Sequence, residues 1–526
     1  MLRAAVVFAA AAGAVACQSE PSGPQAEPET LKSSRVSGFA GVTAAHGADV
    51  AEAGRTVLAR NGTAADAAVA MAYTAAVTVP SRAGLGGGGV CLLHRRKSGT
   101  TKAFLFPAGA GDGEAAAPAL TRAMAILHDR HGRAPWDGLM GPARRRAHQG
   151  FQVSRVLAQD FDAAGERLGA GARRVFGRWD GNLPGAGDRI TRPALAATLT
   201  GLREQGPGYV HTHPFVPRLL DSARAAGFGL NAAALNAVQP RTADTLTMTV
   251  SGRRLHLPPP PALGGLAAGQ TVRLMDAMQG LGTTSGAGRA HLAVEALKRA
   301  WSQQRLWNES ASARPAAFLA DARIDALAET WNRGAPTPAE TLTPPPMDAD
   351  GMPPGTGFVV ADRFGSVVAC GLTMNGLFGT GKMAQGTGVL LAPEKAPAKA
   401  LRGLVPALFT DPEGARATGG FVAADGGTAP GTLAQVLDRL AADDPVAEAV
   451  ATPRAHHPGR PDVARVTRAM PWQIMRDLRD MGHEVRIRDD LGTIAAIVCP
   501  PGADGPVQAC QPASDARGSG AALRAE

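Results

Sequence analysis

The hydrophobic pattern of residues 355–391 predicts a buried β-hairpin. Two short apolar runs, Phe358–Ala361 and Ser366–Met374, flank the turn-forming residues Asp362–Gly365. Runs of this length, bounded by Gly and Asp, are typical of strands that are covered on both faces. The next segment, Asn375–Gly388, holds five glycines in fourteen residues. So many glycines indicate a backbone that needs unusual dihedral angles or lies very close to another segment.

Helical periodicity predicts several helices in the first part of the chain. Asp49–Asn61 and Ala67–Val77 carry apolar residues at helical spacing, and Thr63 and Asp66 suit the first turn of the second helix. A glycine run, residues 84–89, follows this pair. Farther along, the pattern predicts a strand at Val90–His94, a helix at Leu120–His131, a helix that begins at Pro135-Trp136, and a helix at His291–Trp301.

Composition and charge exclude some classes of function. The 526 residues are 45% hydrophobic, which is enough for a large core, and no Gly/Ser-rich linker divides residues 40–515. The formal net charge is +9, but the arginines are scattered and no basic stretch is interleaved with aromatic residues. We therefore expect no nucleic-acid partner.

The N-terminus predicts export to the bacterial cell envelope. A short positive start is followed by the apolar run Ala4–Ala16, which is too short to span a membrane as a helix. Ala14–Gln18 resembles a lipobox, so residues 1–17 are predicted to be a signal peptide with Cys17 as the acylated residue. Ordinary signal-peptide cleavage and a retained anchor are the alternatives. Residues 18–38 predict a flexible tether, and we expect membrane contact only through the lipid anchor.

The four further cysteines do not indicate a metal site, and they do not strongly imply a disulfide. Cys91 and Cys370 lie in apolar runs and are predicted to be small core residues. Cys499 and Cys510 flank a Pro/Gly loop, but a hairpin there could place Cys510 nearer Ala496, so a disulfide is not strongly implied. Because no CxxC or CxxxH spacing is present, we expect no metal site and no other cofactor.

The order of these motifs resembles the γ-glutamyltransferases (γ-glutamyltranspeptidases, glutathione hydrolases), which are N-terminal-nucleophile hydrolases. One part of the resemblance is the order helix, Asn61-Gly62, alanine-rich helix, Pro80, glycine run, strand, and another is the segment 119–161. A third part is the register of the residues after the hairpin turn, namely Asp362, Gly365, Asn375, Phe378, Gly379 and Gly381. The resemblance covers roughly residues 40–515.

The resemblance implies an αββα sandwich, in which two stacked, mainly antiparallel sheets lie between layers of helices. Residues 39–354 would be a large-subunit-like region and residues 355–515 a small-subunit-like region of one integrated fold. Residues 516–526 would be a tail. The Pro-rich segment Ala335–Pro354 would be an exposed loop that, in the family, leads into the point of self-cleavage.

The family nucleophile is a threonine that opens a strand and cuts the chain before itself, and the matching position here is Gly355. Thr356 is in register with the family's second threonine and is the alternative candidate nucleophile. If Thr356 served as nucleophile, its spacing to Asp362 would be one residue shorter than in the family. A shift of one residue along a strand sends the side chain to the opposite face. A bulge at Gly355 and Gly357 could restore the direction.

Other site residues are partly retained. Gly426 and Gly427 resemble the family's glycine pair, whose backbone N–H groups would stabilise an oxyanion, and Asn375 matches an asparagine that binds substrate or steadies the nucleophile. The family arginine that binds the glutamate α-carboxylate is replaced by Pro107. Arg402 could compensate for it, and Glu394 lies close to the position of the acidic residue for the α-amine.

These departures predict a degenerate catalytic and glutamate-binding site with little or no γ-glutamyl transfer or hydrolysis. A working amidohydrolase of altered specificity that uses Thr356 is the alternative, and a non-enzymatic envelope binding or scaffold protein is a third. The expected partner is a small γ-glutamyl or other amide ligand. The sequence does not determine the oligomeric state.

Overall fold

A computed structural model describes Met1 and residues 38–109, 115–211, 215–310, 314–500 and 507–526. Residues 31–526 form one compact unit, and the fold described below is that of this unit. Apart from Met1 and Gly38, the predicted signal peptide with Cys17 and the predicted tether lie outside the described residues. Within the described ranges, no helix is both long enough and apolar enough to cross a membrane.

Two antiparallel sheets form the centre of the unit. The strand order of the first sheet is β20 (Ala521–Ala525), β1 (Gly41–Ala45), β9 (Thr356–Asp362), β10 (Val367–Thr373), β2 (Gly88–Arg95), β3 (Thr100–Phe106) and β6 (Arg241–Asp244). The order of the second sheet is β19 (Gln511–Ser514), β18 (Ile494–Val498), β14 (Ala417–Ala423), β13 (Val405–Thr410), β8 (Arg253–Leu257) and β7 (Leu246–Val250). Both sheets combine strands from the two sides of Gly355.

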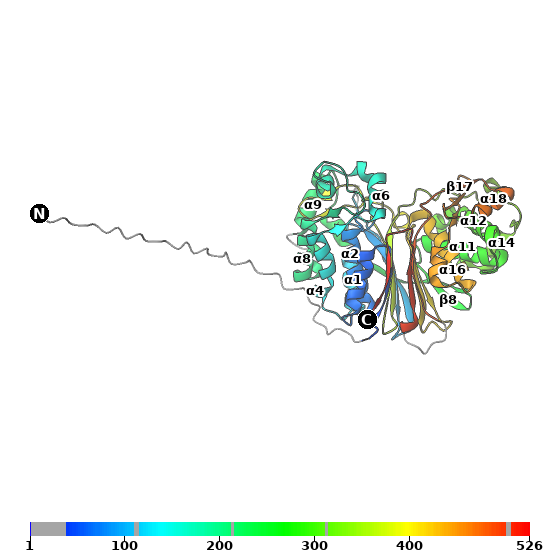
Figure 1. Cartoon of the computed structure of the whole chain (residues 1–526), viewed down its shortest axis with the longest axis horizontal. Coiled ribbons are helices and arrows are strands. Elements are labelled where there is room, and N and C mark those ends of the chain that lie inside the picture. Colours follow the sequence, from blue (N-terminus) through cyan, green and yellow to red (C-terminus); the bar gives the residue numbers. More distant parts are fainter. Residues whose placement is uncertain (2–37, 110–114, 212–214, 311–313, 501–506) are drawn as a thin grey trace. The chain divides into compact units, whose positions relative to one another are not determined.

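Helices cover the outer faces of both sheets, as Figure 1 shows. Val359 of β9 and Val422 of β14 belong to the core between the sheets, whereas Phe358 packs in the core under the first helical layer. The described residues therefore form the predicted αββα sandwich, and this prediction is confirmed. The first helical layer includes α1 (Ala48–Leu58) and α2 (Ala64–Thr78), and the second includes α11 (Gly264–Gln279), α12 (Gly286–Ser302) and α16 (Ala429–Ala441).

Shorter elements complete the two layers. On the side of the first sheet are α3 (Leu120–His131), α4 (Trp136–Leu139), α5 (Gly141–Gln149), α6 (Arg155–Ala164), α7 (Ala170–Phe176), α8 (Pro193–Gln205), α9 (Phe215–Ala225) and α10 (Ala232–Ala237). On the other side are α13 (Gln304–Ser310), α14 (Asp321–Ala328), α17 (Val446–Ala451) and α18 (Trp472–Asp480). The helix α15 (Pro397–Ala400) precedes β13, and the short strands are β4 (Phe151–Gln152), β5 (Arg189–Ile190), β11 (Met383–Ala384), β12 (Val389–Leu390), β15 (Ala455–His456), β16 (Ala464–Val466) and β17 (Val485–Ile487).

The elements predicted from periodicity are confirmed. β9 and β10 form the hairpin, and every residue of both strands is buried. Thr63 caps α2: its hydroxyl accepts a hydrogen bond from the Asp66 N–H at 3.1 Å, and the Asp66 carboxylate accepts one from the Thr63 N–H at 2.9 Å. This reciprocal pair satisfies two backbone donors that the helix itself leaves free. The helix α3 has the predicted bounds.

The two glycine-rich segments lie against main-chain atoms, as predicted. A Cβ atom on Gly86 would overlap the carbonyl oxygen of Leu390, and one on Gly89 would overlap that of Gly371. In the second segment, Gly379 and Gly381 have φ angles of +62° and +73°, which side chains rarely adopt.

Two predictions about cysteine were wrong, because four cysteines form two disulfides. Cys91 and Cys370 are buried, but they are bonded to each other as direct partners on β2 and β10. Cys499 and Cys510 form the second disulfide, one position beyond the Val498–Gln511 pair of β18 and β19. In each pair the Cα atoms are 4.0 Å apart, and it is strand register, which the sequence does not give, that brings them together.

The prediction of a tail at residues 516–526 was also wrong. Ala521–Ala525 form β20, which pairs with β1 along its whole length, from Ala45–Ala521 to Gly41–Ala525. This strand covers the edge of β1 that would otherwise carry unpaired N–H and C=O groups. The short run AALRA has too few strong strand formers to be recognised from its sequence.

Candidate active site

The candidate site lies where β9 begins and β14 ends. Gly355 directly precedes β9, and its N–H donates a hydrogen bond to the carbonyl oxygen of Ala424 at 2.6 Å. Ala424 follows β14, so this bond joins the ends of the two sheets. The position that matches the family nucleophile is therefore held at the junction of the sheets.

The space beside Gly355 is closed to a side chain. A Cβ atom at this position would overlap the carbonyl oxygen of Leu372 and would lie 2.6 Å from Cδ2 of Leu404. It would also lie 3.3 Å from the carbonyl oxygen of Ala424. Gly355 thus lacks a hydroxyl, and its surroundings also fill the volume that the first carbon of a threonine side chain would need.

The Thr356 side chain points to the face of the first sheet opposite to the one that a side chain at position 355 would face. The register between β9 and β10 runs without a shift from Thr356–Leu372 to Ala361–Val367, so no bulge interrupts this described pair of strands. Because strand side chains alternate, Thr356 shares the outer face with Phe358, towards the first helical layer. A Cβ atom on Gly357 would instead meet the Val422 side chain between the sheets.

The glycine pair adjoins the chain that leads into Gly355. Gly426 has a φ angle of +64°, and a Cβ atom on it would lie 2.6 Å from the carbonyl oxygen of Met352. A Cβ atom on Gly427 would overlap the carbonyl oxygen of Ala349. Ala349 and Met352 are buried, so this part of the segment predicted to be an exposed loop packs over the glycine pair.

Leu401–Leu404 also reaches this place, but the Arg402 side chain turns elsewhere. A Cβ atom on Gly403 would lie 2.7 Å from the Cα atom of Gly426. The Arg402 guanidinium donates to Oδ1 of Asn308 on α13 at 2.8 Å. In this structure the Arg402 guanidinium is therefore not placed to bind the carboxylate of a ligand beside Gly426.

Asn375 and Glu394 gather near Pro107, which follows β3. The Asn375 side chain is fully buried, and its Nδ2 donates to the carbonyl oxygens of Pro393 at 3.0 Å and Ala108 at 3.4 Å. A Cβ atom on Gly109 would lie 3.0 Å from Oε1 of Glu394. The structure thus brings Asn375 and Glu394 together, while the arginine position of the family remains a proline.

A partly buried ionic cluster, Arg82 with Asp160 and Asp425, lies against Gly355. Arg82 donates to Asp160 from Nε at 2.8 Å and from Nη2 at 2.9 Å, and to Oδ1 of Asp425 from Nη1 at 2.5 Å. The same Nη1 lies 3.5 Å from the carbonyl oxygen of Gly355. Thr493 completes the cluster, since its N–H and hydroxyl donate to Oδ2 of Asp425 at 2.7 and 2.6 Å.

Electrostatics keeps Arg82 and Asp425 ionised. Burial alone would lower the pKa of Arg82, but Asp425 and Asp160 outweigh it and raise that pKa above its ordinary value. Burial alone would raise the pKa of Asp425, but Arg82, His46 and the Thr493 hydrogen bonds hold it below its usual range. Burial lowers the pKa of His46, whose Nε2 lies 3.1 Å from the carbonyl oxygen of Val422. This cluster was not predicted from the sequence, although Arg82 and Asp425 each stand just before a glycine motif.

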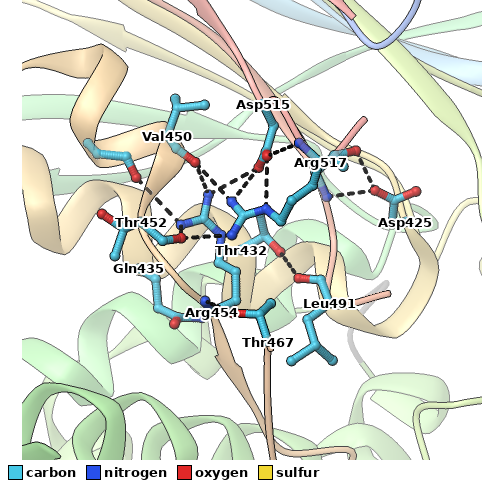
Figure 2. A network of polar contacts seen from close by, with 12 residues as sticks. Asp425, Thr432, Gln435, Val450, Thr452, Arg454, Thr467, Leu491, Asp515 and Arg517 are labelled. Carbon is cyan, nitrogen blue, oxygen red and sulfur yellow. Dashed lines mark hydrogen bonds and ion pairs between the residues drawn. The ribbon is translucent and has the colours of Figure 1, made fainter. Parts of the chain in front are cut away.

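A second polar network fixes the segment after β19, as Figure 2 shows. Arg517 donates to Asp515 from Nη2 at 2.6 Å, and Nη2 of Arg454 lies 3.5 Å from the same carboxylate. Both guanidinium groups also donate to the carbonyl oxygens of Val450 and Thr452, at the C-terminal end of α17. Cations are favoured at helix C-termini, so these contacts are a structural support for the sheet beside the site.

The site therefore combines a position without a hydroxyl, Gly355, with the glycine pair Gly426-Gly427 near the same chain segment. Two charged side chains at this place, Arg82 and Asp425, are bound to each other.

Comparisons with known proteins agree with this reading of the fold. The family profile described as gamma-glutamyltranspeptidase matches residues 50–112, 107–403 and 395–525. The glutathione hydrolase proenzyme of Escherichia coli is 25% identical over 518 residues, which cover 88% of each chain. The glutathione hydrolase proenzyme of Pseudomonas aeruginosa is 27% identical over 523 residues, 89% of this chain and 91% of that protein.

A solved structure shows the same fold. The cephalosporin acylase from Bacillus halodurans superposes with a TM-score of 0.78, at 19% identity, over 95% of this chain and 98% of that one. The αββα sandwich is thus of the N-terminal-nucleophile-hydrolase type. Because the matches to the family profile together span residues 50–525, the chain belongs to the γ-glutamyltranspeptidase family.

Proposed function

We propose that this protein is a family member that does not cleave itself and carries out little or no γ-glutamyl transfer or hydrolysis. The observation that carries the proposal is the closed space at Gly355, which Leu372 and Leu404 fill. Self-cleavage in this family type needs a hydroxyl at the strand start that attacks the preceding carbonyl. With neither a hydroxyl nor room for one, the peptide bond after Pro354 has no attacking group.

The altered recognition residues support the same proposal. A carboxylate ligand that loses a bidentate arginine in a desolvated site loses several kcal/mol of binding energy. Here Pro107 stands in the arginine position and Arg402 is bonded to Asn308. The residues around Asn375 and Glu394 would then bind a small amide or γ-glutamyl compound weakly, without turning it over.

The test is a reducing gel together with an assay of γ-glutamyl anilide hydrolysis. Reduction is essential because the Cys91–Cys370 disulfide would hold two fragments together after a cut near residue 355. We expect one full-length band and no hydrolysis above background. Two reduced bands, with the smaller beginning at Thr356, would instead favour the alternative of an amidohydrolase with Thr356 as nucleophile, and Thr356→Ala should then restore the single band.

We also propose that the protein resides in the cell envelope, anchored through Cys17. The apolar run Ala4–Ala16, whose end forms part of the lipobox-like Ala14–Gln18, supports this location. In cell fractionation with detergent phase separation, we expect the protein in the detergent phase and a Cys17→Ser variant outside it. Equal partition of the two proteins would contradict acylation at Cys17.

A further inference from the structure

Three potential metal ligands meet far from the candidate active site in sequence, on α12 and after α18. His291 and Glu295 stand one helical turn apart on α12, and His483 follows α18. Their exposed fractions are 1%, 0% and 7%. One ligand atom from each side chain lies within 4.8 Å of the other two.

The hydrogen bonds around His291 leave its Nδ1 as an electron-pair donor. Nε2 of His291 lies 2.8 Å from the carbonyl oxygen of Asn332, which can only accept, so Nε2 carries the proton. In the neutral ring, Nδ1 then holds a lone pair, and it faces Nε2 of His483 at 2.6 Å. A histidine whose second nitrogen donates to a carbonyl is the usual form of a metal ligand.

A carboxylate oxygen of Glu295 lies at the same place, and one of its two oxygens accepts no hydrogen bond. Oε2 accepts from Nη1 of Arg299 at 2.6 Å and from the Thr337 N–H at 3.2 Å, whereas Oε1 is buried and has no hydrogen-bond partner. The Lys298 ammonium is 3.0 Å from Oε1, but it lies outside the direction of a hydrogen bond. Lys298 is satisfied instead by the Thr337 carbonyl oxygen at 2.7 Å and Asp462 at 2.8 Å.

We propose that His291, Glu295 and His483 bind one divalent transition-metal ion of the zinc class. A proton shared between the two rings would satisfy Nδ1 of His291 but would leave Oε1 of Glu295 with an ion pair to Lys298 and no hydrogen bond, whereas a metal ion would be bound by all three groups. Two imidazoles and one carboxylate suit zinc better than calcium or magnesium, which prefer oxygen ligands. A water molecule would complete the tetrahedron.

The charges of the neighbours fit an ion held mainly by imidazole nitrogen. Glu295 and Asp462 balance Lys298 and Arg299, so the network contributes no net charge to the site. Tetrahedral bonds of about 2.0–2.1 Å place two ligand nitrogens about 3.3 Å apart. Metal binding would therefore replace the 2.6 Å contact between Nδ1 of His291 and Nε2 of His483, and the His483 ring would move away from His291 to make room for the ion.

The metal would strengthen a small core. The hydrophobic cluster that joins α12 to α18 and the short strands β15 and β16 contains only seven buried residues, Ala290, Val294, Ala455, Ala464, Val466, Met470 and Leu478. Because binding energy of a metal that requires the folded site adds to folding energy, one ion between α12 and His483 would hold α18 in place.

The test uses the full mature chain without a histidine tag. The protein is stripped with a chelator, loaded with zinc sulfate and desalted, and its zinc content is measured by plasma mass spectrometry. His483→Asn removes one ligand, and His148→Asn, on an exposed position of α5, is the matched control. We expect one zinc ion per chain for the wild type and the control, a higher melting temperature with zinc, and zinc affinity lowered about tenfold or more in His483→Asn.

Cobalt gives a second measurement that does not depend on how well the variant folds. Bound Co²⁺ in the wild type should show the strong visible absorption of a tetrahedral site, and added zinc should remove it. Wild-type protein that retains no stoichiometric zinc after loading and shows no such absorption would overturn the proposal. Equal zinc binding by folded His483→Asn would overturn it as well.

Discussion

Main-chain oxygens and the Leu404 side chain fill the space beside Gly355, and this closed space can be tested one carbon atom at a time. Gly355→Ala adds only the Cβ atom that would overlap the Leu372 carbonyl oxygen. We expect it to lower the free energy of unfolding by about 1–3 kcal/mol, as overpacking does. Gly355→Thr should cost at least as much and should remain a single chain on a reducing gel.

Gly351→Ala is the matched control, because no atom lies within 4 Å of a Cβ at that position. Urea denaturation should show a change of less than about 0.5 kcal/mol for it. If Gly355→Thr is cut before the substituted residue, or if both alanine variants are equally stable, the space at position 355 is not closed.

The residue scale is also where sequence reasoning reached its limit. The register of Asp362 and Gly365 identified position 355 and the absence of its hydroxyl from the letters alone. The carbonyl of Leu372 on β10 and the side chain of Leu404 before β13 close the space, and no pattern near position 355 in the sequence indicates either of them. The two disulfides were missed for the same reason, because each depends on the pairing of two strands.

At the scale of elements, Arg82 ties three parts of the chain together at the site. It connects the turn after α2 to Asp160 on α6 and to Asp425 after β14. Arg82→Met leaves the buried Asp160 and the partly buried Asp425 without their arginine, and loss of a buried ion-pair partner typically costs about 3–5 kcal/mol. Thermal and urea unfolding should show a loss of that size.

Two further variants separate charge from packing at this cluster. Arg224→Met removes an arginine whose side chain is 76% exposed, and it should change stability by less than about 0.5 kcal/mol. Combining Arg82→Met with Asp160→Asn and Asp425→Asn should recover part of the loss, because no unpaired charge then remains buried. A loss of stability in Arg82→Met no larger than that in Arg224→Met would contradict the stabilising role of Arg82 at this cluster.

The elements themselves were largely predictable. The hairpin β9–β10, the capped helix α2 and the helix α3 follow from apolar spacing and end signals that act over a few residues. β20 was not predictable, because its five residues become a strand only by pairing with β1 at the other end of the chain. The ionic cluster was missed because Arg82, Asp160 and Asp425 are far apart in sequence.

At the scale of the whole molecule, the two disulfides close loops of very different length. Cys91 and Cys370 are 279 residues apart, and Cys499 and Cys510 are 11 apart. In the chain-entropy account, removal of the longer link costs about 5 kcal/mol and of the shorter about 3 kcal/mol. Paired alanine variants compared by urea denaturation should follow that order, and the reverse order would contradict it.

Acid should destabilise the molecule through buried histidines. Burial lowers the pKa of His256 to about 4 and that of His456 to about 3. Between pH 6.5 and 4, these histidines bind protons in the unfolded chain but remain neutral in the folded chain. The free energy of unfolding therefore falls as pH falls through this window. Each histidine should cost about 2 kcal/mol by pH 5.

Calorimetry of His256→Gln at pH 7.5 and pH 5 measures this effect. The variant should lose less stability on acidification than the wild type, because glutamine does not bind a proton in the unfolded chain. His148→Gln, an exposed control, should keep the wild-type dependence. Equal pH dependence in all three proteins would show that His256 takes up its proton in the folded state.

The mass of the purified chain tests the absence of self-cleavage most directly. The protein is incubated for days at its working temperature, then denatured, reduced to open the Cys91–Cys370 link, and measured by intact-mass spectrometry. The closed space at Gly355 predicts one species with the mass of the whole mature chain at every time point. A pair of species whose masses sum to the whole chain plus one water, with the smaller beginning at Gly355 or Thr356, would contradict it.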